Sequence, residues 1–174
     1  MPWLAGTALI HSLQVTRSRG LFKSWTILLA ILAFSLSLLG TFLVRSGILI
    51  SVHAFASDPS RGIFILVLLS LISGGALFLY AFRARVIQDD GSFNLVSRES
   101  FLLINNILLI ISVFVILLGT LYPLFLDALG MGKISVGPPY FNLVFIIPMI
   151  PLSIFLGIGM HTVWKKTSII KLIN

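Results

Sequence analysis

Cysteine is absent from the 174 residues, and only five residues are acidic. The absence of cysteine excludes a disulfide framework, a thiolate metal site and a cysteine nucleophile. Charged residues make up 10% of the chain, whereas soluble domains contain about a quarter. Hydrophobic residues make up 58%, and the mean hydropathy is +1.12. A chain of this length cannot bury so much apolar surface in its own core, so its solvent must be lipid.

Four apolar runs have the length of a membrane-spanning helix, which needs about 20 residues to cross a hydrocarbon core of about 30 Å. None of them contains Asp, Glu, Lys or Arg, and they comprise residues 25–44, 63–82, 101–122 and 141–160. Residues 1–15 form a shorter apolar stretch, which we interpret as a partial fifth span. The sequence therefore predicts an all-α, polytopic membrane helix bundle with four full spans and one partial span, in a single domain.

The basic residues between the spans predict the orientation of the chain, because Lys and Arg are concentrated in cytoplasmic loops. Residues 16–24, residues 83–100 and the tail after residue 160 carry three basic residues each. Residues 45–62 carry two, and residues 123–140 carry one. The segments with three are expected in the cytoplasm, and the other two on the outer side. Since the basic residues lie in short clusters between apolar runs, the net charge of +7 does not indicate nucleic-acid binding.

Only three histidines occur, and the first, His11, lies within the apolar stretch of residues 1–15. It lies six residues before Arg17, which at 1.5 Å per residue is about 9 Å from the cytoplasmic edge. Helical spacing places it with Trp3, Thr7 and Gln14 on a polar face that is expected to face protein. An ionisable group at this depth is a candidate functional site, and imidazole is a common proximal ligand of haem iron. The alternative is a histidine that forms a hydrogen bond across a helix pair.

The other two histidines are expected near the membrane surfaces. His53 lies in the apolar segment 48–55, where it can offer a nitrogen to a flat cofactor at the outer surface, or simply be an interfacial histidine with a solvated tip. Arg45 and Arg61 flank this segment and are candidates for contacts to a carboxylate, a propionate or another anion, although Arg45 can also extend to the interface. His161 lies beside a tryptophan and two lysines, which is typical of an interfacial anchor.

Polar groups within the spans are few. Asn105 and Asn106 lie near the start of the run 101–122 and are expected to form hydrogen bonds with a neighbouring helix. No carboxylate lies within a span, which disfavours a proton-coupled carrier. A fragment of a carrier or permease for haem or a small anion nevertheless stays open, because Arg45 and Arg61 would attract anions. A non-catalytic membrane remnant also stays open.

Four stretches of the chain are distinctive, in this order: MPWLAGTALIHSL, GLFKSWT, GTFLVRSGILISVHAFASDPSRG and GKISVGPPYFN. They resemble the CcmF family, the haem lyase subunit of the bacterial cytochrome c maturation system. The similarity runs from about residue 1 to about residue 166 and covers the middle portion of a longer family chain. The chain is therefore expected to be a fragment, or one piece of a split lyase.

The resemblance implies roles for two histidines. His11 matches the family's LIHSL histidine, which is an axial ligand of a b-type haem held among the helices. His53 matches the SVHAF histidine, one of two outer histidines that serve the incoming substrate haem. The family's tryptophan-rich segment, the other outer histidine and the second ligand of the haem b have no counterpart in this sequence. The fragment alone is therefore expected to be inactive and to bind haem weakly, and His161 acquires no role.

The resemblance also implies a function in cytochrome c-type biogenesis. The complete protein would attach haem to apocytochrome c on the outer face of the cytoplasmic (inner) membrane, by addition of the apocytochrome thiols to haem vinyl groups. The expected partners are apocytochrome c, haem-delivery and other maturation subunits, the remainder of the lyase and the lipid bilayer, with no nucleic acid.

Overall fold

The structure, a computed structural model, describes residues 1–46, 59–132 and 134–166. Over these ranges the chain forms five α-helices and one short 3-10 helix, and no strand. The elements are α1 (Pro2–Arg19), α2 (Lys23–Arg45), α3 (Pro59–Arg83), η1 (Ala84–Val86), α4 (Arg98–Ala128) and α5 (Pro138–Met160). The prediction of an all-α bundle is confirmed.

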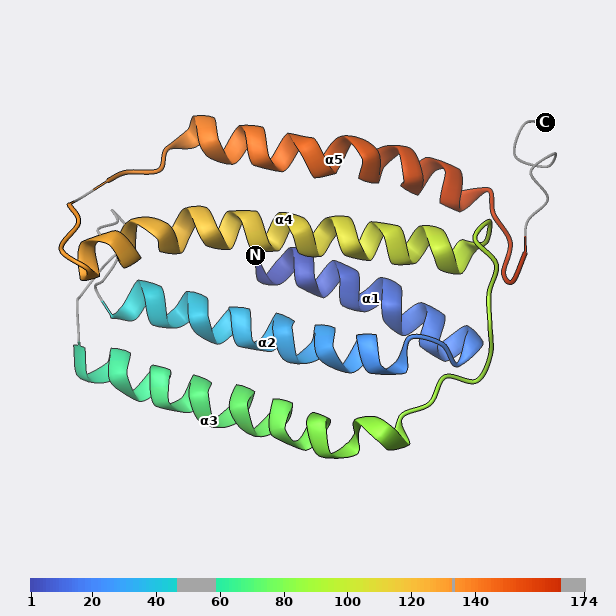
Figure 1. Cartoon of the computed structure of the whole chain (residues 1–174), viewed down its shortest axis with the longest axis horizontal. Helices are drawn as coiled ribbons and strands as arrows, with labels where there is room; N and C mark the ends of the chain where they lie inside the picture. The colour runs from blue at the N-terminus through green and yellow to red at the C-terminus, as the bar shows by residue number, and fades with distance from the viewer. Residues whose placement is uncertain (47–58, 133, 167–174) are drawn as a thin grey trace.

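The helices lie side by side in the order α3, α2, α1, α4, α5 (Figure 1). The shortest of the five, α1, packs against both α2 and α4, whereas α3 packs mainly against α2 and α5 mainly against α4. The chain leaves α1 and enters α4 at the same end of the bundle, so these two helices are antiparallel (Figure 1). Because α1 is the middle helix of the five, a group on α1 that points toward α4 lies near the centre of the row.

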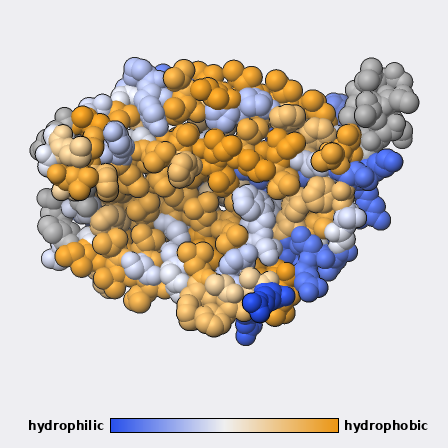
Figure 2. Space-filling model, in the orientation of Figure 1, coloured by the Kyte–Doolittle hydropathy of each residue, from blue (hydrophilic) through white to orange (hydrophobic). Residues whose placement is uncertain are grey.

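Four of the described helices are long and apolar enough to cross a membrane: Lys23–Arg45, Ser60–Val86, Arg98–Ala128 and Pro138–Met160. Each contains one of the expected apolar runs, and α1, at 18 residues, is the shorter fifth helix. Hydrophobic residues cover most of the visible side of the bundle, and hydrophilic residues gather at one end (Figure 2). The chain is thus a polytopic helical membrane bundle.

The main core fills the space between α1, α2 and α4. Its buried members are Leu4, Ala5, Ala8, Leu29, Leu36, Leu109 and Val113. Ala5 and Ala8 are small and fully buried, which lets the backbone of α1 approach its neighbours closely. A small residue also lies between α4 and α5, where Gly119 packs directly against the ring of Tyr140. The Tyr140 hydroxyl donates a hydrogen bond to the Val115 carbonyl at 3.0 Å.

Hydroxyl groups pair across the helices that lipid surrounds. Ser12 and Thr26 join α1 to α2 through their hydroxyl oxygens, 2.6 Å apart, and Thr16 lies 2.8 Å from the same Thr26 hydroxyl. Ser35 of α2 and Ser73 of α3 form a similar pair at 2.6 Å. Such bonds are stabilising because the apolar surroundings offer no water as a competing partner. They fix α1, α2 and α3 relative to one another.

The turn between α1 and α2 depends on Gly20, which caps α1 in the left-handed region with φ of 66°. Glycine adopts this conformation without the steric cost that a Cβ imposes. A Cβ at this position would also collide with the carboxylate of Asp90. The Gly20 carbonyl accepts a hydrogen bond from the backbone N–H of Asp90 at 3.1 Å. The turn is therefore bound to the segment that precedes α4.

Candidate functional site

His11 lies on α1 at the edge of the face that packs against α4. An α-helix turns by about 100° per residue, so His11 is about 20° around the axis from Leu4 and about 80° from Trp3. Leu4 is buried in the core, and Trp3 is 76% exposed. The His11 side chain is half-buried, and the side chain of Asn106 on α4 lies beside it. The imidazole therefore has one side against protein and one side open.

Asn106 is completely buried, and its side chain connects α4 to α1. In the amide orientation that satisfies all of its partners, its NH₂ group donates to the Ala8 carbonyl at 3.2 Å and to the Leu102 carbonyl at 3.3 Å. The bond to Ala8 crosses from α4 to α1, whereas the bond to Leu102 stays within α4. The expectation that Asn106 contacts a neighbouring helix is confirmed. Asn105 differs, because its Oδ1 is buried and accepts no hydrogen bond from any described residue.

The polar face predicted on α1 is only partly correct. Gln14 is exposed like Trp3, and its amide donates to Ser18 on the same helix at 3.3 Å. The Thr7 hydroxyl donates to the Trp3 carbonyl, also within α1, at 3.0 Å. Among the described helices, only His11 at the edge of this face meets a neighbour. The spacing rule grouped residues over a sector of about 80°, which is wider than the contact with α4.

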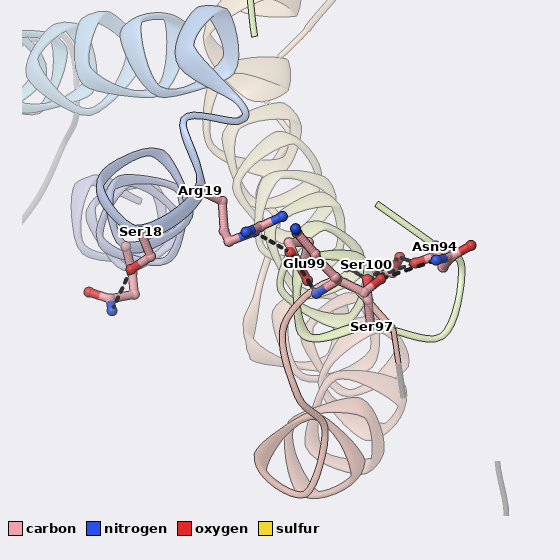
Figure 3. A network of polar contacts seen from close by, with 8 residues as sticks. Ser18, Arg19, Asn94, Ser97, Glu99 and Ser100 are labelled. Atoms are coloured by element: carbon pink, nitrogen blue, oxygen red, sulfur yellow. Dashed lines mark hydrogen bonds and ion pairs between the residues drawn. The ribbon is translucent and has the colours of Figure 1, made fainter. Parts of the chain in front are cut away.

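A second polar cluster lies at the start of α4, where Glu99 is completely buried. Arg19 of α1 donates from its Nε to Glu99 Oε1 at 3.1 Å, and the backbone N–H of Lys165 donates to the two carboxylate oxygens at 3.0 and 3.1 Å (Figure 3). A carboxylate in the first turn of a helix also interacts favourably with the helix dipole. Glu99 therefore connects α1, α4 and the segment that follows α5.

Further contacts surround this cluster. Ser97 caps α4 by accepting a hydrogen bond from the Ser100 N–H at 3.3 Å, and its own hydroxyl donates to the Asn94 carbonyl at 2.7 Å (Figure 3). Lys23 forms an ion pair with Asp90 at 2.8 Å. We call this end of the bundle the basic end, because it carries Arg17, Arg19, Lys23, Arg83, Arg85, Arg98, Lys165 and Lys166.

Comparison with known proteins gives concordant matches. The family model described as Cytochrome C assembly protein matches residues 1–51. The cytochrome c-type biogenesis protein CcmF of Pseudomonas aeruginosa is 63% identical over 96% of this chain, and that of Escherichia coli K12 is 56% identical over 95%. A solved structure named Cytochrome c Heme Lyase CcmF matches 96% of the chain with a TM-score of 0.70 at 28% identity. Over most of its length, the chain belongs to the CcmF family.

The chain spans about a quarter of the length of the curated CcmF relatives it matches, 25% and 26% for the two named above. It covers 23% of the solved CcmF chain. The match of residues 1–51 to the assembly-protein family includes His11 and ends before His53. The predicted resemblance to the CcmF family is confirmed, and so is the prediction of a multi-pass membrane protein.

The remaining candidate residues are distributed over both ends of this CcmF-family chain. His53 lies outside the described residues, so its predicted role stays a prediction. Arg45 ends α2 and Arg61 lies in the first turn of α3, and both are exposed at the end opposite the basic end. His161 follows α5 at the basic end and is exposed. The described residues therefore do not bring the arginines near His11.

The donor atoms around His11 fit a haem iron better than a simple metal ion. Among the described residues, no group of three or more His, Asp or Glu side chains is placed to hold a metal ion. Haem needs only axial ligands from protein, because the macrocycle supplies the equatorial nitrogens itself. His11 provides one half-buried imidazole, which is the kind of axial ligand that a haem would take from protein.

Sequence reasoning missed Glu99. Its partners Arg19 and Lys165 are 80 and 66 residues away along the chain, a separation at which no local pattern operates. The spacing of Ser97 and Glu99, an N-cap serine followed by an acid in the first turn, is the signal that could have marked the start of α4.

Proposed function

We propose that the chain is part of a cytochrome c-type biogenesis protein, a haem lyase subunit that handles haem and attaches it to apocytochrome c on the outer face of the inner membrane. Two findings support this: identity of 63% to the Pseudomonas aeruginosa CcmF protein, and the match to the solved structure named Cytochrome c Heme Lyase CcmF. The observation that carries the proposal is the half-buried His11 on α1, which lies beside Asn106 of α4 in the middle of the helix row. Apocytochrome c, haem-delivery proteins and other maturation subunits are the proposed partners.

His11 is proposed as one axial ligand of a b-type haem. When bound, such a haem supplies a one-electron redox centre, and the protein residues determine its position. Asn106 binds the Ala8 carbonyl of α1 from α4, and the small residues Ala5 and Ala8 let α1 lie close to its neighbours. His161 is not proposed as the second ligand, because it is exposed at the end of α5, which packs mainly against α4. The second ligand is therefore assigned to another segment of the complete protein.

His53 is proposed to contact the substrate haem on the outer side, with Arg45 and Arg61 as contacts for its propionates. This requires the basic end to lie in the cytoplasm, as the distribution of Lys and Arg indicates. Both arginines are exposed at the opposite end of the bundle, so their positions agree with this arrangement. Their guanidinium groups suit carboxylate recognition, because they offer paired donors in a planar fork.

Cysteine labelling tests this orientation, and the absence of native cysteine leaves no background signal. Arg85→Cys at the basic end and Met131→Cys at the opposite end both replace exposed residues. A membrane-impermeant maleimide is expected to label position 131 in intact spheroplasts, and position 85 only after permeabilisation. His53→Cys should behave like position 131. Labelling of position 85 from outside would overturn the orientation and the proposed role of His53.

Exchange into a complete relative tests the function. In this experiment the chain replaces the matching quarter of the Pseudomonas aeruginosa CcmF protein, and we call the product the chimera. In a strain that lacks CcmF, the chimera is expected to restore covalent haem staining of a reporter cytochrome c. The chain expressed alone is expected to restore none. A chimera that reaches the membrane at normal abundance yet forms no holocytochrome c would contradict the proposal.

A further inference from the structure

We infer that the space between the start of α4 and the end of α5 is a binding site for one membrane phospholipid. A pocket of about 280 Å³ lies there, and among its lining residues are Arg98, Phe101, Leu102 and Asn105 of α4, with Leu156 and Met160 of α5. None of the lining residues belongs to α1, so the pocket is separate from His11. The inference therefore goes beyond the proposed handling of haem.

Asn105 is the first of two observations that point to a ligand. Its side chain lines the pocket, the residue is only 1% exposed, and its Oδ1 accepts no hydrogen bond from any described residue. Buried polar groups are nearly always hydrogen-bonded, because leaving one without a partner is costly. The adjacent Asn106 shows the usual state, since its NH₂ group bonds two backbone carbonyls. The occupant of the pocket would supply the partner that Asn105 lacks.

Arg98 is the second observation. It is half-buried at the first position of α4, its Nη2 donates to the Met160 carbonyl in a long contact of 3.5 Å, and its guanidinium lies over the Trp164 ring at 5.3 Å. No carboxylate of the described residues forms an ion pair with it, whereas the neighbouring Glu99 pairs with Arg19. Most of the five guanidinium donors are therefore left for another acceptor. A cation beside the pocket without a counter-ion favours an occupant with an anionic group.

The spacing of these two groups matches an amphiphile that lies along the helix. Arg98 and Asn105 are seven residues apart on α4, which is about two turns and about 10 Å along the axis. Arg98 lies at the basic end, and Asn105 lies further toward the apolar middle of the bundle (Figure 1). In a bilayer the guanidinium is then at the level of the head groups, and the amide is below them. A glycerophospholipid carries its phosphate and its ester carbonyls in the same order.

Each polar group of such a lipid has a partner in the pocket. Arg98 would donate to the phosphodiester oxygens, because its planar fork suits a phosphate. An amide can present either its oxygen or its NH₂ group, so Asn105 would donate to an ester carbonyl. The pocket is slightly smaller than the roughly 300–1,000 Å³ of sites that enclose a drug-sized ligand. It would therefore hold the phosphate and glycerol region, and the acyl chains would continue into the bilayer along the exposed Leu156 and Met160.

Two variants of the chimera test the site, each with a matched control. Leu156→Trp fills the pocket from α5 and leaves both polar groups in place. Its control is Ile154→Trp, because Ile154 is also exposed on α5 but is not among the lining residues. Arg98→Gln removes the charge at the pocket. Its control is Arg83→Gln, because Arg83 is an exposed basic residue at the same end, on α3.

The measurements use delipidated chimera and added palmitoyl-oleoyl phosphatidylglycerol. Native mass spectrometry gives the lipid affinity, and thermal unfolding gives the stabilisation by bound lipid. Leu156→Trp and Arg98→Gln are expected to weaken binding by about 10-fold or more, the usual effect of losing a hydrogen bond to a charged group or the space for the ligand. Both controls should stay within about 2-fold of the unmodified chimera. Glycerol phosphate, which lacks acyl chains, should not raise the unfolding temperature.

Asn105→Leu tests the amide at nearly constant volume. The variant is expected to weaken phosphatidylglycerol binding by about 5-fold, because one neutral hydrogen bond to the lipid is lost. The rise in unfolding temperature on addition of lipid should shrink accordingly. Unchanged lipid binding in Asn105→Leu would show that the amide does not contact the lipid, and this would overturn the assigned pose.

Three further results would overturn the inference. The first is equal lipid binding by Leu156→Trp and Ile154→Trp, and the second is equal binding by Arg98→Gln and Arg83→Gln. Equality in the second pair would leave only a general attraction of anionic lipid to the basic end. The third is an unmodified chimera that binds no phospholipid, which would mean that another segment of the complete protein fills the pocket. The proposed ligation by His11 is read from the haem spectrum, so its failure is distinct from all three.

Discussion

Replacing His11 with alanine is expected to abolish the b-type haem spectrum of the chimera while leaving the protein in the membrane. An axial imidazole is a direct bond to the iron, and alanine offers no atom that can replace it. This loss should be complete. The measurement is the reduced-minus-oxidised absorption spectrum of the purified protein, normalised to protein content.

The same substitution should cost little stability, which makes the result interpretable. His11 is only half-buried, so its truncation removes little buried surface. Single substitutions typically cost about 1 kcal/mol, less than the stability of a typical folded domain. Membrane abundance should therefore change modestly. A normal amount of protein without a haem band is the expected combination.

Two control variants identify the cause of such a loss. Gln14→Ala also truncates a polar side chain of α1, but Gln14 is exposed and its amide is bonded only within α1. His161→Ala removes another imidazole, exposed at the end of α5. Both chimeras should retain the full spectrum. A His11→Ala chimera with the same b-type bands as these controls would show that the iron is held by other residues.

Hydropathy was sufficient to predict the helices but not their ends. The run 101–122 stops at Pro123, yet α4 continues through that proline to Ala128. In a lipid-surrounded helix, proline is tolerated because neighbouring groups satisfy the freed carbonyl. The run 141–160 omits Pro138 and Pro139, which begin α5, since proline is favoured in the first turn of a helix. At these two ends the helices extend beyond the predicted apolar runs, through Pro123 in α4 and from Pro138 in α5.

The candidate site was predictable as a set of residue types but not as a set of contacts. The sequence places His11 in an apolar stretch and Asn106 in a span, and both are unusual there. Their pairing depends on the axial register of α1 against α4, which the small residues Ala5 and Ala8 and the ion pair of Arg19 with Glu99 fix. Periodicity describes one helix at a time and contains no information about this register.

Replacing Glu99 with alanine is expected to have the largest effect on stability, about 3 kcal/mol in the free energy of unfolding. Removing one partner of a buried ion pair costs about 3–5 kcal/mol, because the other charge is left uncompensated. The low end of this range applies, since the Arg19 side chain is 21% exposed and regains water. The Lys165 N–H also loses its acceptor. Unfolding by SDS in mixed micelles measures the change.

Three further variants separate charge from hydrogen bonding. Glu99→Gln keeps an acceptor for the Lys165 N–H but not the charge, so its loss should be intermediate. Asp127→Ala, which removes an exposed carboxylate at the opposite end of α4, should lie within about 0.5 kcal/mol of the wild type. The double variant with Arg19→Ala should cost less than the sum of the two single variants, because the pair acts as a unit. If the double variant loses as much unfolding free energy as the two single variants together, Arg19 and Glu99 do not act as a coupled pair.

The Glu99 contact also has a consequence for haem. Arg19 lies eight residues after His11 on α1, and Glu99 lies seven residues before Asn106 on α4. At 1.5 Å per residue these separations are about 12 Å and about 10 Å, so the two contacts between the antiparallel helices are about two turns apart. Breaking the first contact should let α1 shift along α4 and loosen the second. Glu99→Ala is therefore expected to lower haem content in the chimera although Glu99 contacts no ligand. A Glu99→Ala chimera that is destabilised yet keeps its full haem content would show that the register at His11 is set by Ala8 and Asn106 alone.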